Sequence, residues 1–169
     1  NANTTLIAVF KYTGIYYQND YNNATESDWV SGNTGRYTVS IAGDDNDKYT
    51  QISAVATGNN GTAITSNAVQ VDAGKDYIAE FDLALTGSSN QLSGFAVNAK
   101  DSKKYALVLQ LKTAGSTTWT VNGTTDVTLE KGVFYHYKIE NVAEGVKVTI
   151  TPTAGGDAVL DGVTYANDT

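Results

Sequence analysis

Glu80 and Asp82 are two residues whose type and spacing could do chemistry. They stand two positions apart in an alternating segment, in which Phe81 and Leu83 are the apolar neighbours. Because residues two apart in a β-strand lie on one face, both carboxylates face one way and the apolar side chains face the other. Carboxylates on an open face can accept hydrogen bonds from sugar hydroxyls. The alternative is that they form the solvated side of a strand.

Further polar side chains alternate with apolar ones in the segments 94–99, 105–112 and 133–139. If these strands share a sheet with Glu80 and Asp82, one face is core and the other is a hydrogen-bonding surface. The residues of that surface are Glu80, Asp82, Asn98, Gln110, Lys112, His136 and Lys138. Planar polar groups suit sugar hydroxyls, and aromatic rings suit the C–H faces of a sugar. An ordinary solvated sheet face stays open as the alternative.

The two tryptophans are the largest aromatic side chains. Trp119 stands just before the turn residues Asn122-Gly123, and we expect it to be the stacking platform for a sugar ring. A place in the core or at a sheet edge is the alternative for Trp119. Trp29 is expected to pack under the segment Asn19–Gly35, which is the longest without clear alternation and therefore the expected long loop.

Motifs for catalysis are missing from the sequence. It has no Cys, and its one histidine, His136, has no Ser or Asp motif around it. Gly-x-Ser-x-Gly, His-Glu-x-x-His and phosphate-binding glycine loops are also missing. A Ser-His-Asp site can assemble from distant residues, but no motif supports one here. We therefore expect a protein that is not an enzyme.

Acidic residues gather in a run, Asp44-Asp45-Asn46-Asp47, between two expected strands. Further oxygen donors occur at Asp20 and Asn22 before it and at Asp157 and Asp161 after it. Ca²⁺ takes oxygen ligands from separated loops, and crowded carboxylates repel unless a cation lies among them. The spacing does not match an EF-hand, and for the run alone a solvated turn is the alternative.

Short alternating segments follow one another along the chain, separated by turns of Gly, Asn, Asp, Ser or Thr. This pattern predicts an all-β antiparallel two-sheet β-sandwich, a jelly roll, of about a dozen strands and without a convincing helix. The expected strands are Leu6–Tyr12, Arg36–Ala42, Lys48–Ala56, Ala63–Val71, Asp76–Leu85, Ser93–Ala99, Tyr105–Lys112, Thr118–Val121, Asp126–Leu129, Phe134–Asn141, Lys147–Thr151 and Ala158–Tyr165. Asn122-Gly123 is expected to form a tight hairpin turn.

Composition limits the class of protein. A chain of 169 residues with 41% hydrophobic residues can bury one core, so we expect a single β-sandwich domain over residues 1–169. The net charge of −7 argues against nucleic acid as a partner, and no apolar run is long enough for membrane insertion. Cys is absent, and Met is absent too, including at position 1. We expect a domain taken from a larger multimodular protein, or a mature form left after processing.

The segment Asn19-Asp20-Tyr21-Asn22 leads to Asp28-Trp29, the run Asp44-Asp45-Asn46-Asp47-Lys48-Tyr49 follows, and the closing strand is Leu160-Asp161-Gly162-Val163-Thr164. These segments resemble secreted jelly-roll carbohydrate-binding modules. The middle of the chain, from Tyr77 through Thr118–Gly123 to Phe134–Ile139, is similar to concanavalin-like lectin and laminin-G-type sheets, so the resemblance spans most of the chain. In those carbohydrate-binding modules an early acidic residue and a late Asp bind a structural Ca²⁺. By position, the resemblance implies Asn22, with Asp20 as a substitute, and Asp161; the acidic run adds Asp44 or Asp45 to the expected site.

The segment Glu80-Phe81-Asp82-Leu83 also resembles the start of the Glu-x-Asp-x-x-Glu strand of laminarinase-type glucanases. In those jelly rolls a nucleophile and an acid/base carboxylate flank the scissile bond. This chain has Ala84 and Leu85 where the second catalytic glutamate falls, so the proton donor for the leaving group is missing.

Together these observations predict a non-catalytic module that attaches an enzyme or a cell to plant polysaccharide, either cell-wall glycan or starch. We expect it to be secreted or at the surface of a bacterial cell, lectin-like, monomeric and covalently joined to neighbouring domains. The competing hypothesis is a structural or adhesive β-sandwich spacer of a bacterial surface protein. A jelly-roll glycan hydrolase or lyase is the less favoured third hypothesis.

Overall fold

The computed structural model of the protein describes residues 6–10, 14–22, 24–25, 27, 29–31, 35, 37–54, 64–66, 77–86, 92–96 and 105–166. Within these residues the regular elements are β-strands, and the strands with an assigned register pair antiparallel. The predicted all-β class is therefore confirmed. Among the described residues there is no helix that is long and apolar enough to cross a membrane.

The chain divides into two compact units, which are described one at a time. The first contains Asn1–Leu6 and Tyr17–Gln70, and the second contains Ile7–Tyr16 and Val71–Thr169. A single domain over the whole chain stays a prediction.

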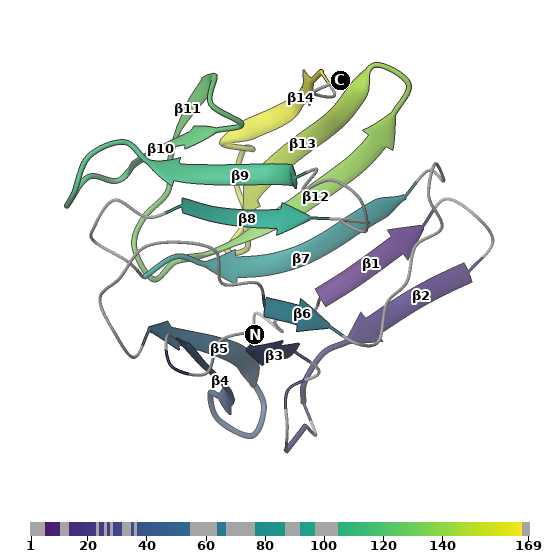
Figure 1. Ribbon diagram of the computed structural model, residues 1–169, viewed down its shortest axis with the longest axis vertical. Helices are drawn as coiled ribbons and strands as arrows, with labels where there is room; N and C mark the ends of the chain where they lie inside the picture. Colours follow the sequence, from purple (N-terminus) through teal and green to yellow (C-terminus); the bar gives the residue numbers. More distant parts are fainter. Residues whose placement is uncertain are drawn as a thin grey trace. The chain divides into compact units, whose positions relative to one another are not determined.

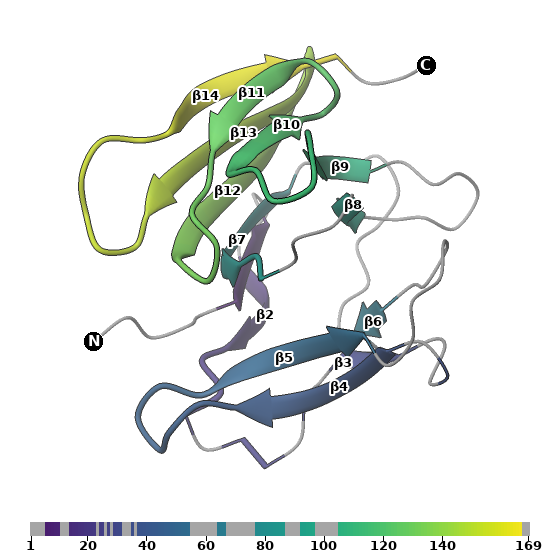
Figure 2. The same ribbon diagram turned by 90° about the vertical axis from the view of Figure 1, so that its left-hand side faces the viewer.

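The first unit contains two short antiparallel pairs of strands. Strand β3 (Trp29–Ser31) pairs with β6 (Ile64–Ser66), and β4 (Tyr37–Ala42) pairs with β5 (Tyr49–Ala54), the long hairpin in Figure 2. Strand β3 interrupts the segment Asn19–Gly35, so a continuous long loop there is wrong. Three residues are too short for alternation to be recognised in the sequence, and β3 gains its hydrogen-bonding partner only through β6.

The second unit contains a six-stranded sheet and a four-stranded sheet (Figure 1). The strand order is β14-β13-β12-β7-β1-β2 in the first sheet and β11-β10-β9-β8 in the second. The bounds are β1 Leu6–Phe10, β2 Gly14–Asn19, β7 Ile78–Ala84, β8 Leu92–Ala96, β9 Tyr105–Leu111, β10 Thr118–Val121, β11 Thr125–Thr128, β12 Phe134–Val142, β13 Gly145–Pro152 and β14 Leu160–Tyr165. The outermost residues of β1 and β2, Leu6 and Tyr17–Asn19, belong to the first unit.

Each sheet of the second unit buries one face, which gives it a sandwich-like architecture. In the four-stranded sheet the buried side chains include Leu107, Leu109, Leu111, Trp119, Val121 and Val127. In the six-stranded sheet they include Ala79, Phe81, Tyr135, Tyr137, Ile139, Val148 and Ile150. The rings of Phe81 and Tyr137 stack in this core with centroids 5.4 Å apart and planes 10° apart. The period-two alternation of the sequence is thus realised as one apolar and one polar face in β7, β12 and β13.

The connections explain how distant segments become neighbours. Strands β8 to β11 follow one another in the four-stranded sheet, and β12 to β14 do so in the six-stranded sheet. The chain leaves the six-stranded sheet after β7 and returns to it at β12, which then pairs with β7. This return places His136 directly opposite Asp82, although they are 54 residues apart in the sequence.

The turn between β10 and β11 confirms the expectation from Asn122-Gly123. Asn122 and Gly123 both have positive φ, 46° and 73°, and the N–H of Thr124 donates to the carbonyl of Val121 at 3.1 Å. Two central residues with positive φ characterise the type I′ turn, whose twist matches that of the flanking strands. The Asn122 side chain also accepts a 2.7 Å hydrogen bond from the Val108 N–H, which fastens the turn to β9.

Candidate functional site

The outer face of the six-stranded sheet brings four of the predicted site residues together. On paired strands β7 and β12, Asp82 stands opposite His136, and Glu80 stands opposite Lys138. Glu140 follows on β12 and stands opposite Lys147 of β13. We call this set the His136 face; its residues are Glu80, Asp82, His136, Lys138, Glu140 and Lys147. Its position follows from the alternation of β12, in which Tyr135, Tyr137 and Ile139 point into the core.

His136 lies between two carboxylates. Its Nδ1 is 2.8 Å from Oδ1 of Asp82, and its Nε2 is 3.8 Å from Oε1 of Glu80. The side chain of Asp82 is only 12% exposed, whereas Glu80 is 27% and His136 is 40% exposed. The Asp82 contact is a hydrogen bond by distance, while the Glu80 contact is too long for one. Asp82 therefore orients the imidazole, and Glu80 interacts with it through charge.

This environment raises the pKa of His136 above the ordinary histidine value. The largest cause is the hydrogen bond with Asp82, and the negative charges of Asp82 and Glu80 act in the same direction. Partial burial acts against them, because it disfavours the charged imidazolium. A raised pKa means that the folded protein favours the protonated ring.

The row of charges continues along the face beyond His136. The Nζ of Lys138 is 3.2 Å from Oε1 of Glu140, and the Nζ of Lys147 is 3.9 Å from Oε2 of the same carboxylate. Positive and negative groups therefore alternate across three adjacent strands. Glu140 and Lys147 were not among the predicted site residues, although their outward parity on two alternating segments is visible in the sequence.

The arrangement supplies hydrogen-bond donors and acceptors held at fixed spacing on rigid strands. Among the described residues, the printed contacts of the His136 nitrogens are to the carboxylates of Asp82 and Glu80, which orient the ring. In chemical terms this face can bind hydroxyl groups, and its imidazole can gain or lose a proton near neutral pH.

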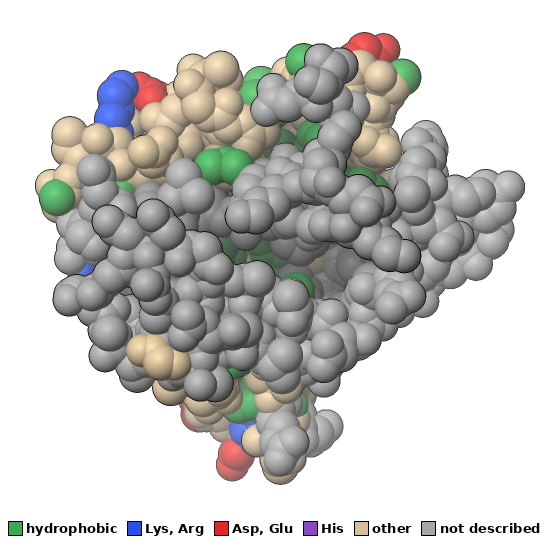
Figure 3. Space-filling model, viewed as in Figure 1, with side chains coloured by type: hydrophobic (Ala, Val, Ile, Leu, Met, Phe, Trp, Pro, Cys, Tyr) green, Lys and Arg blue, Asp and Glu red, His purple; other side chains and the backbone are tan. Residues whose placement is uncertain are grey.

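Gln110 and Lys112 do not share this face, which corrects the expected single polar surface. They lie at the end of β9, which pairs with β8 and β10 and so belongs to the four-stranded sheet with neither β7 nor β12 beside it. Both side chains are exposed. There Lys112 forms an ion pair with Asp126, and the Thr120 hydroxyl donates to Oδ1 of Asp126 at 3.0 Å. We call this set the Asp126 face; its residues are Gln110, Lys112, Thr118, Thr120, Asp126 and Thr128. In Figure 3, the side chains coloured as charged lie near the outline of the view.

The hydrogen bonds from Lys112 and Thr120 lower the pKa of Asp126 below its ordinary value, and the Lys112 charge adds to this effect. Asp126 and Thr120 were not predicted as site residues. They are recognisable only once the register of β10 and β11 is known, which places Thr120 opposite Asp126.

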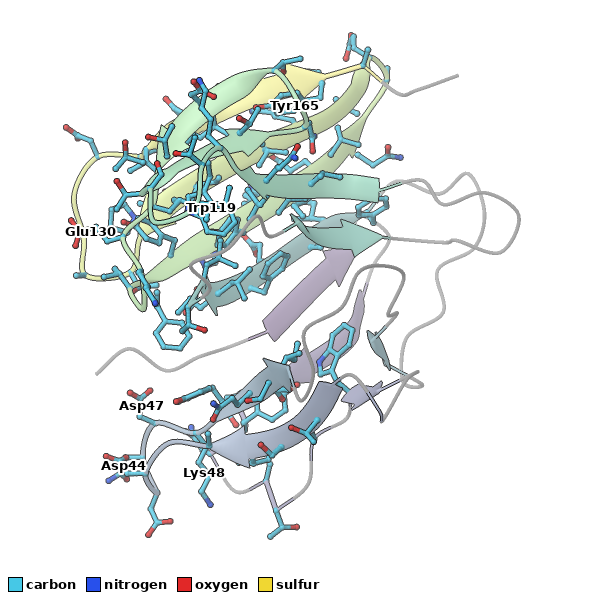
Figure 4. All side chains as sticks on the ribbon, turned by 60° about the vertical axis from the view of Figure 1, so that its left-hand side comes forward. Asp44, Asp47, Lys48, Trp119, Glu130 and Tyr165 are labelled. Carbon is cyan, nitrogen blue, oxygen red and sulfur yellow. The ribbon has the colours of Figure 1, made fainter. Side chains whose placement is uncertain are left out.

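Trp119 is not a stacking platform, and this expectation is wrong. Its side chain is 3% exposed, and in the register it stands between Leu111 of β9 and Val127 of β11, which are also buried (Figure 4). The indole thus belongs to the core and offers no open face to a ligand. Asn98, another predicted site residue, lies outside the described residues.

The residues expected to bind Ca²⁺ engage in local contacts. Asp20 accepts hydrogen bonds from the backbone and side-chain nitrogens of Asn22, each at 3.1 Å. In the β4–β5 turn seen in Figure 4, Asp44 accepts from the Asn46 N–H at 3.1 Å, and Asp45 lies 3.7 Å from the Nζ of Lys48.

The fifth expected ligand, Asp161, is exposed on β14 of the second unit, whereas the other four belong to the first unit. Among the described residues no group of three or more His, Cys, Asp or Glu side chains could hold a metal ion. One oxygen stands out: Oδ1 of Asn22 is buried and has no hydrogen-bond partner among the described residues.

Comparisons with family models, with curated proteins and with solved structures find no match for this chain, so the site rests on its own geometry.

Proposed function

We propose that the protein is a non-catalytic carbohydrate-binding module that attaches an enzyme or a cell to plant polysaccharide. The observation that supports this proposal is the His136 face, where carboxylate, imidazole and ammonium groups stand in register on β7, β12 and β13. Sugar hydroxyls need such donors and acceptors at fixed positions. Rigid strands keep the entropic cost of ordering these side chains low.

Within this proposal the more exposed groups of the face bind the sugar, and the less exposed Asp82 positions the imidazole of His136. His136, Glu80 and Lys138 each keep part of their surface open, whereas Asp82 orients the imidazole. Phe134 stands two positions before His136 on β12, and it is half-buried. We assign Phe134 the aromatic contact with a sugar C–H face, a role that the buried Trp119 cannot take.

The parent protein in this proposal is bacterial and either secreted or attached to the cell surface. The module is a monomer joined covalently to neighbouring domains, and its sandwich has the jelly-roll connectivity of concanavalin-like folds. It does not bind nucleic acid, since the chain carries a net charge of −7.

A structural or adhesive spacer is the second candidate, and the Asp126 face favours it. The outward side chains there are Thr, Lys, Asp and Gln, which form a polar surface of the kind that one face of an antiparallel sheet turns to water. A spacer needs no ligand on the His136 face. A glycan hydrolase or lyase is less favoured than either, because Ala84 and Leu85 replace the second glutamate.

Affinity electrophoresis against glucans, mannans, xylans, pectins and starch tests the proposal. At least one polysaccharide should retard the wild-type protein. Glu80→Gln and Phe134→Ala should reduce the retardation, whereas the matched variant Asp126→Asn on the other sheet should migrate as wild type does. If no polysaccharide in the panel retards the protein, the spacer hypothesis replaces the binding hypothesis. If Glu80→Gln and Asp126→Asn behave alike, the glycan site is not the His136 face.

The absence of catalysis has its own test. During prolonged incubation with laminarin, lichenan or pectin, the protein should release neither reducing ends nor unsaturated products. Release that disappears in Glu80→Gln or Asp82→Asn would identify an enzyme instead.

Structural Ca²⁺ also belongs to the proposal. It is supported by the buried Oδ1 of Asn22, which lacks a hydrogen-bond partner among the described residues, in a side chain whose Nδ2 donates to Asp20. An ion that binds only the folded state raises its stability by mass action, by about 2.7 kcal/mol at a hundredfold excess over Kd. Thermal unfolding with millimolar Ca²⁺ should therefore occur at a higher temperature than with chelator. Asp20→Asn should remove the difference and Asp157→Asn should keep it; superimposable wild-type curves would remove the metal from the proposal.

A further inference from the structure

His136 contacts a different carboxylate with each ring nitrogen. Nδ1 is hydrogen-bonded to Asp82 at 2.8 Å, and Nε2 faces Glu80 at 3.8 Å. The two contacts differ in what they require of the ring. A neutral imidazole has one N–H and one lone pair, whereas the imidazolium has two N–H groups. Only the protonated ring can present an N–H to both carboxylates at once.

The neutral ring keeps one of these contacts and loses the other. With its remaining proton on Nδ1, it still donates to Asp82, which is the shorter and less exposed contact. Its Nε2 lone pair then faces the Glu80 carboxylate, and the ring no longer carries the positive charge that attracts this carboxylate. Loss of the proton therefore leaves Glu80 without its interaction with His136.

Lys138 is placed to take over Glu80. It stands opposite Glu80 in the register, while its Nζ lies 3.2 Å from Glu140. Glu140 also has Lys147 within 3.9 Å, so it keeps a cation when Lys138 turns away.

Thr151 of β13 stands opposite His136 and Thr149 stands opposite Lys138, and both are uncharged. Among the described residues, the charged groups around the imidazole are thus Glu80 and Asp82 from β7 and Lys138 on its own strand, with Glu140 and Lys147 farther along the face.

We propose that His136 is a proton-operated switch of this face: the protonated ring holds Glu80, and the neutral ring releases Glu80 to Lys138. The proton passes to solvent, and Asp82 keeps the ring in place in both states. The raised pKa of His136 places the change above the ordinary histidine titration.

The single histidine makes the first test direct. Because the chain has one His, its imidazole nitrogens give the only signals of their kind in a ¹H–¹⁵N NMR titration, with no assignment needed. The wild-type midpoint should lie above the ordinary value of about 6.5. Asp82→Asn should lower it most and Glu80→Gln less, whereas Asp126→Asn should leave it unchanged. An ordinary midpoint, or one insensitive to both carboxylates, would overturn the proposal.

A second test measures the exchange of partners. A double-mutant cycle with Glu80→Gln and Lys138→Met gives the coupling between these side chains from unfolding curves. The coupling should be larger at about pH 9 than at about pH 5, because the neutral ring no longer competes for Glu80. The cycle between Lys112→Met and Asp126→Asn serves as control and should change little over this range. Equal Glu80–Lys138 coupling at both pH values would show that His136 does not control Glu80.

One consequence rests on the proposed function. If the His136 face binds a glycan, the neutral ring adds the Nε2 lone pair as an acceptor for a hydroxyl. Affinity for the retarding polysaccharide should then rise about fivefold above the His136 midpoint, as expected for one hydrogen bond of about 1 kcal/mol. His136→Gln should bind without this pH dependence. Binding that is independent of pH would overturn this consequence alone, whereas a failure to bind at any pH would overturn the proposed function and leave the NMR result standing.

Discussion

The two outer faces of the second unit are built alike and respond to different conditions. On the His136 face and on the Asp126 face, alternating strands pair side chains of opposite charge across the sheet. The His136 face has a histidine between two carboxylates, one of them only 12% exposed. The Asp126 face has a lysine beside an exposed carboxylate and a threonine. The first face holds an imidazole whose pKa is raised, and the second holds a carboxylate whose pKa is lowered.

Two polar sheet faces with similar side-chain pairing can therefore respond differently to pH. Cross-strand pairing gives each face a similar modest stabilisation. On the His136 face, the partly buried carboxylate and the titratable ring also make the charge of the face depend on pH.

The pH dependence of stability should therefore have opposite signs on the two faces. The raised pKa of His136 gives stability that is complete below the unfolded-state pKa of about 6.5 and is lost as pH rises through the folded-state value. The lowered pKa of Asp126 gives stability that is complete above its unfolded-state pKa and is lost as pH falls.

The largest effect should come from the core beneath both faces. Trp119→Ala removes a side chain that is 3% exposed, and we expect a loss of about 3–5 kcal/mol in the free energy of unfolding. Urea denaturation followed by circular dichroism measures it. Thr120→Ala, on the adjacent outward position, is the matched control and should cost far less. A Trp119→Ala variant as stable as Thr120→Ala would place the indole outside the core.

A smaller effect should come from the link between His136 and Asp82. Asp82→Asn should cost about 1.5 kcal/mol near pH 6, at the low end for a hydrogen bond between charged groups because His136 is partly exposed. The cost should shrink as pH rises through the folded-state pKa of His136, where the wild type loses the same contribution. Urea denaturation over a pH series measures both. A cost that grows with rising pH would contradict a raised pKa for His136 in the folded protein.

The hydroxyl of Tyr137 should give an effect of opposite sign. It is buried below the His136 face and has no hydrogen-bond partner among the described residues, and burial raises its pKa far above the usual tyrosine value. An unsatisfied buried hydroxyl is destabilising, so Tyr137→Phe should stabilise the protein by about 1 kcal/mol. The stack with Phe81 should persist in the variant. A destabilised Tyr137→Phe would indicate that an ordered water or another group satisfies the hydroxyl.

The Asp126 face should give the smallest effect, seen only in acid. Asp126→Asn should leave stability nearly unchanged near pH 7, because the exposed ion pair with Lys112 contributes little. As pH falls below about 4, the wild type should lose the advantage that the lowered pKa provides, and the two proteins should become equal. Melting temperatures at pH 7 and in acid check this. A larger effect than that of Asp82→Asn would reverse the ranking of the two faces.

Much of the His136 face could be predicted from single strands. The outward parity of Glu80, Asp82, His136 and Lys138 follows from alternation within two segments and needed no knowledge of the fold. Glu140 and Lys147 could have been added by the same rule. Gln110 and Lys112 were misplaced because alternation gives the face of a strand but not the sheet to which the strand belongs.

The all-β class, the two-sided strands and the turn at Asn122-Gly123 follow from the amino-acid sequence alone, because period-two alternation and positive-φ residues are local properties. Which strands are neighbours depends on the tertiary fold. The chain's return to β7 at β12 joined His136 to Asp82, and the register of β10 with β9 and β11 buried Trp119 between Leu111 and Val127. A shift of one residue would turn Trp119 outward, and a strand of four residues leaves that choice to its neighbours.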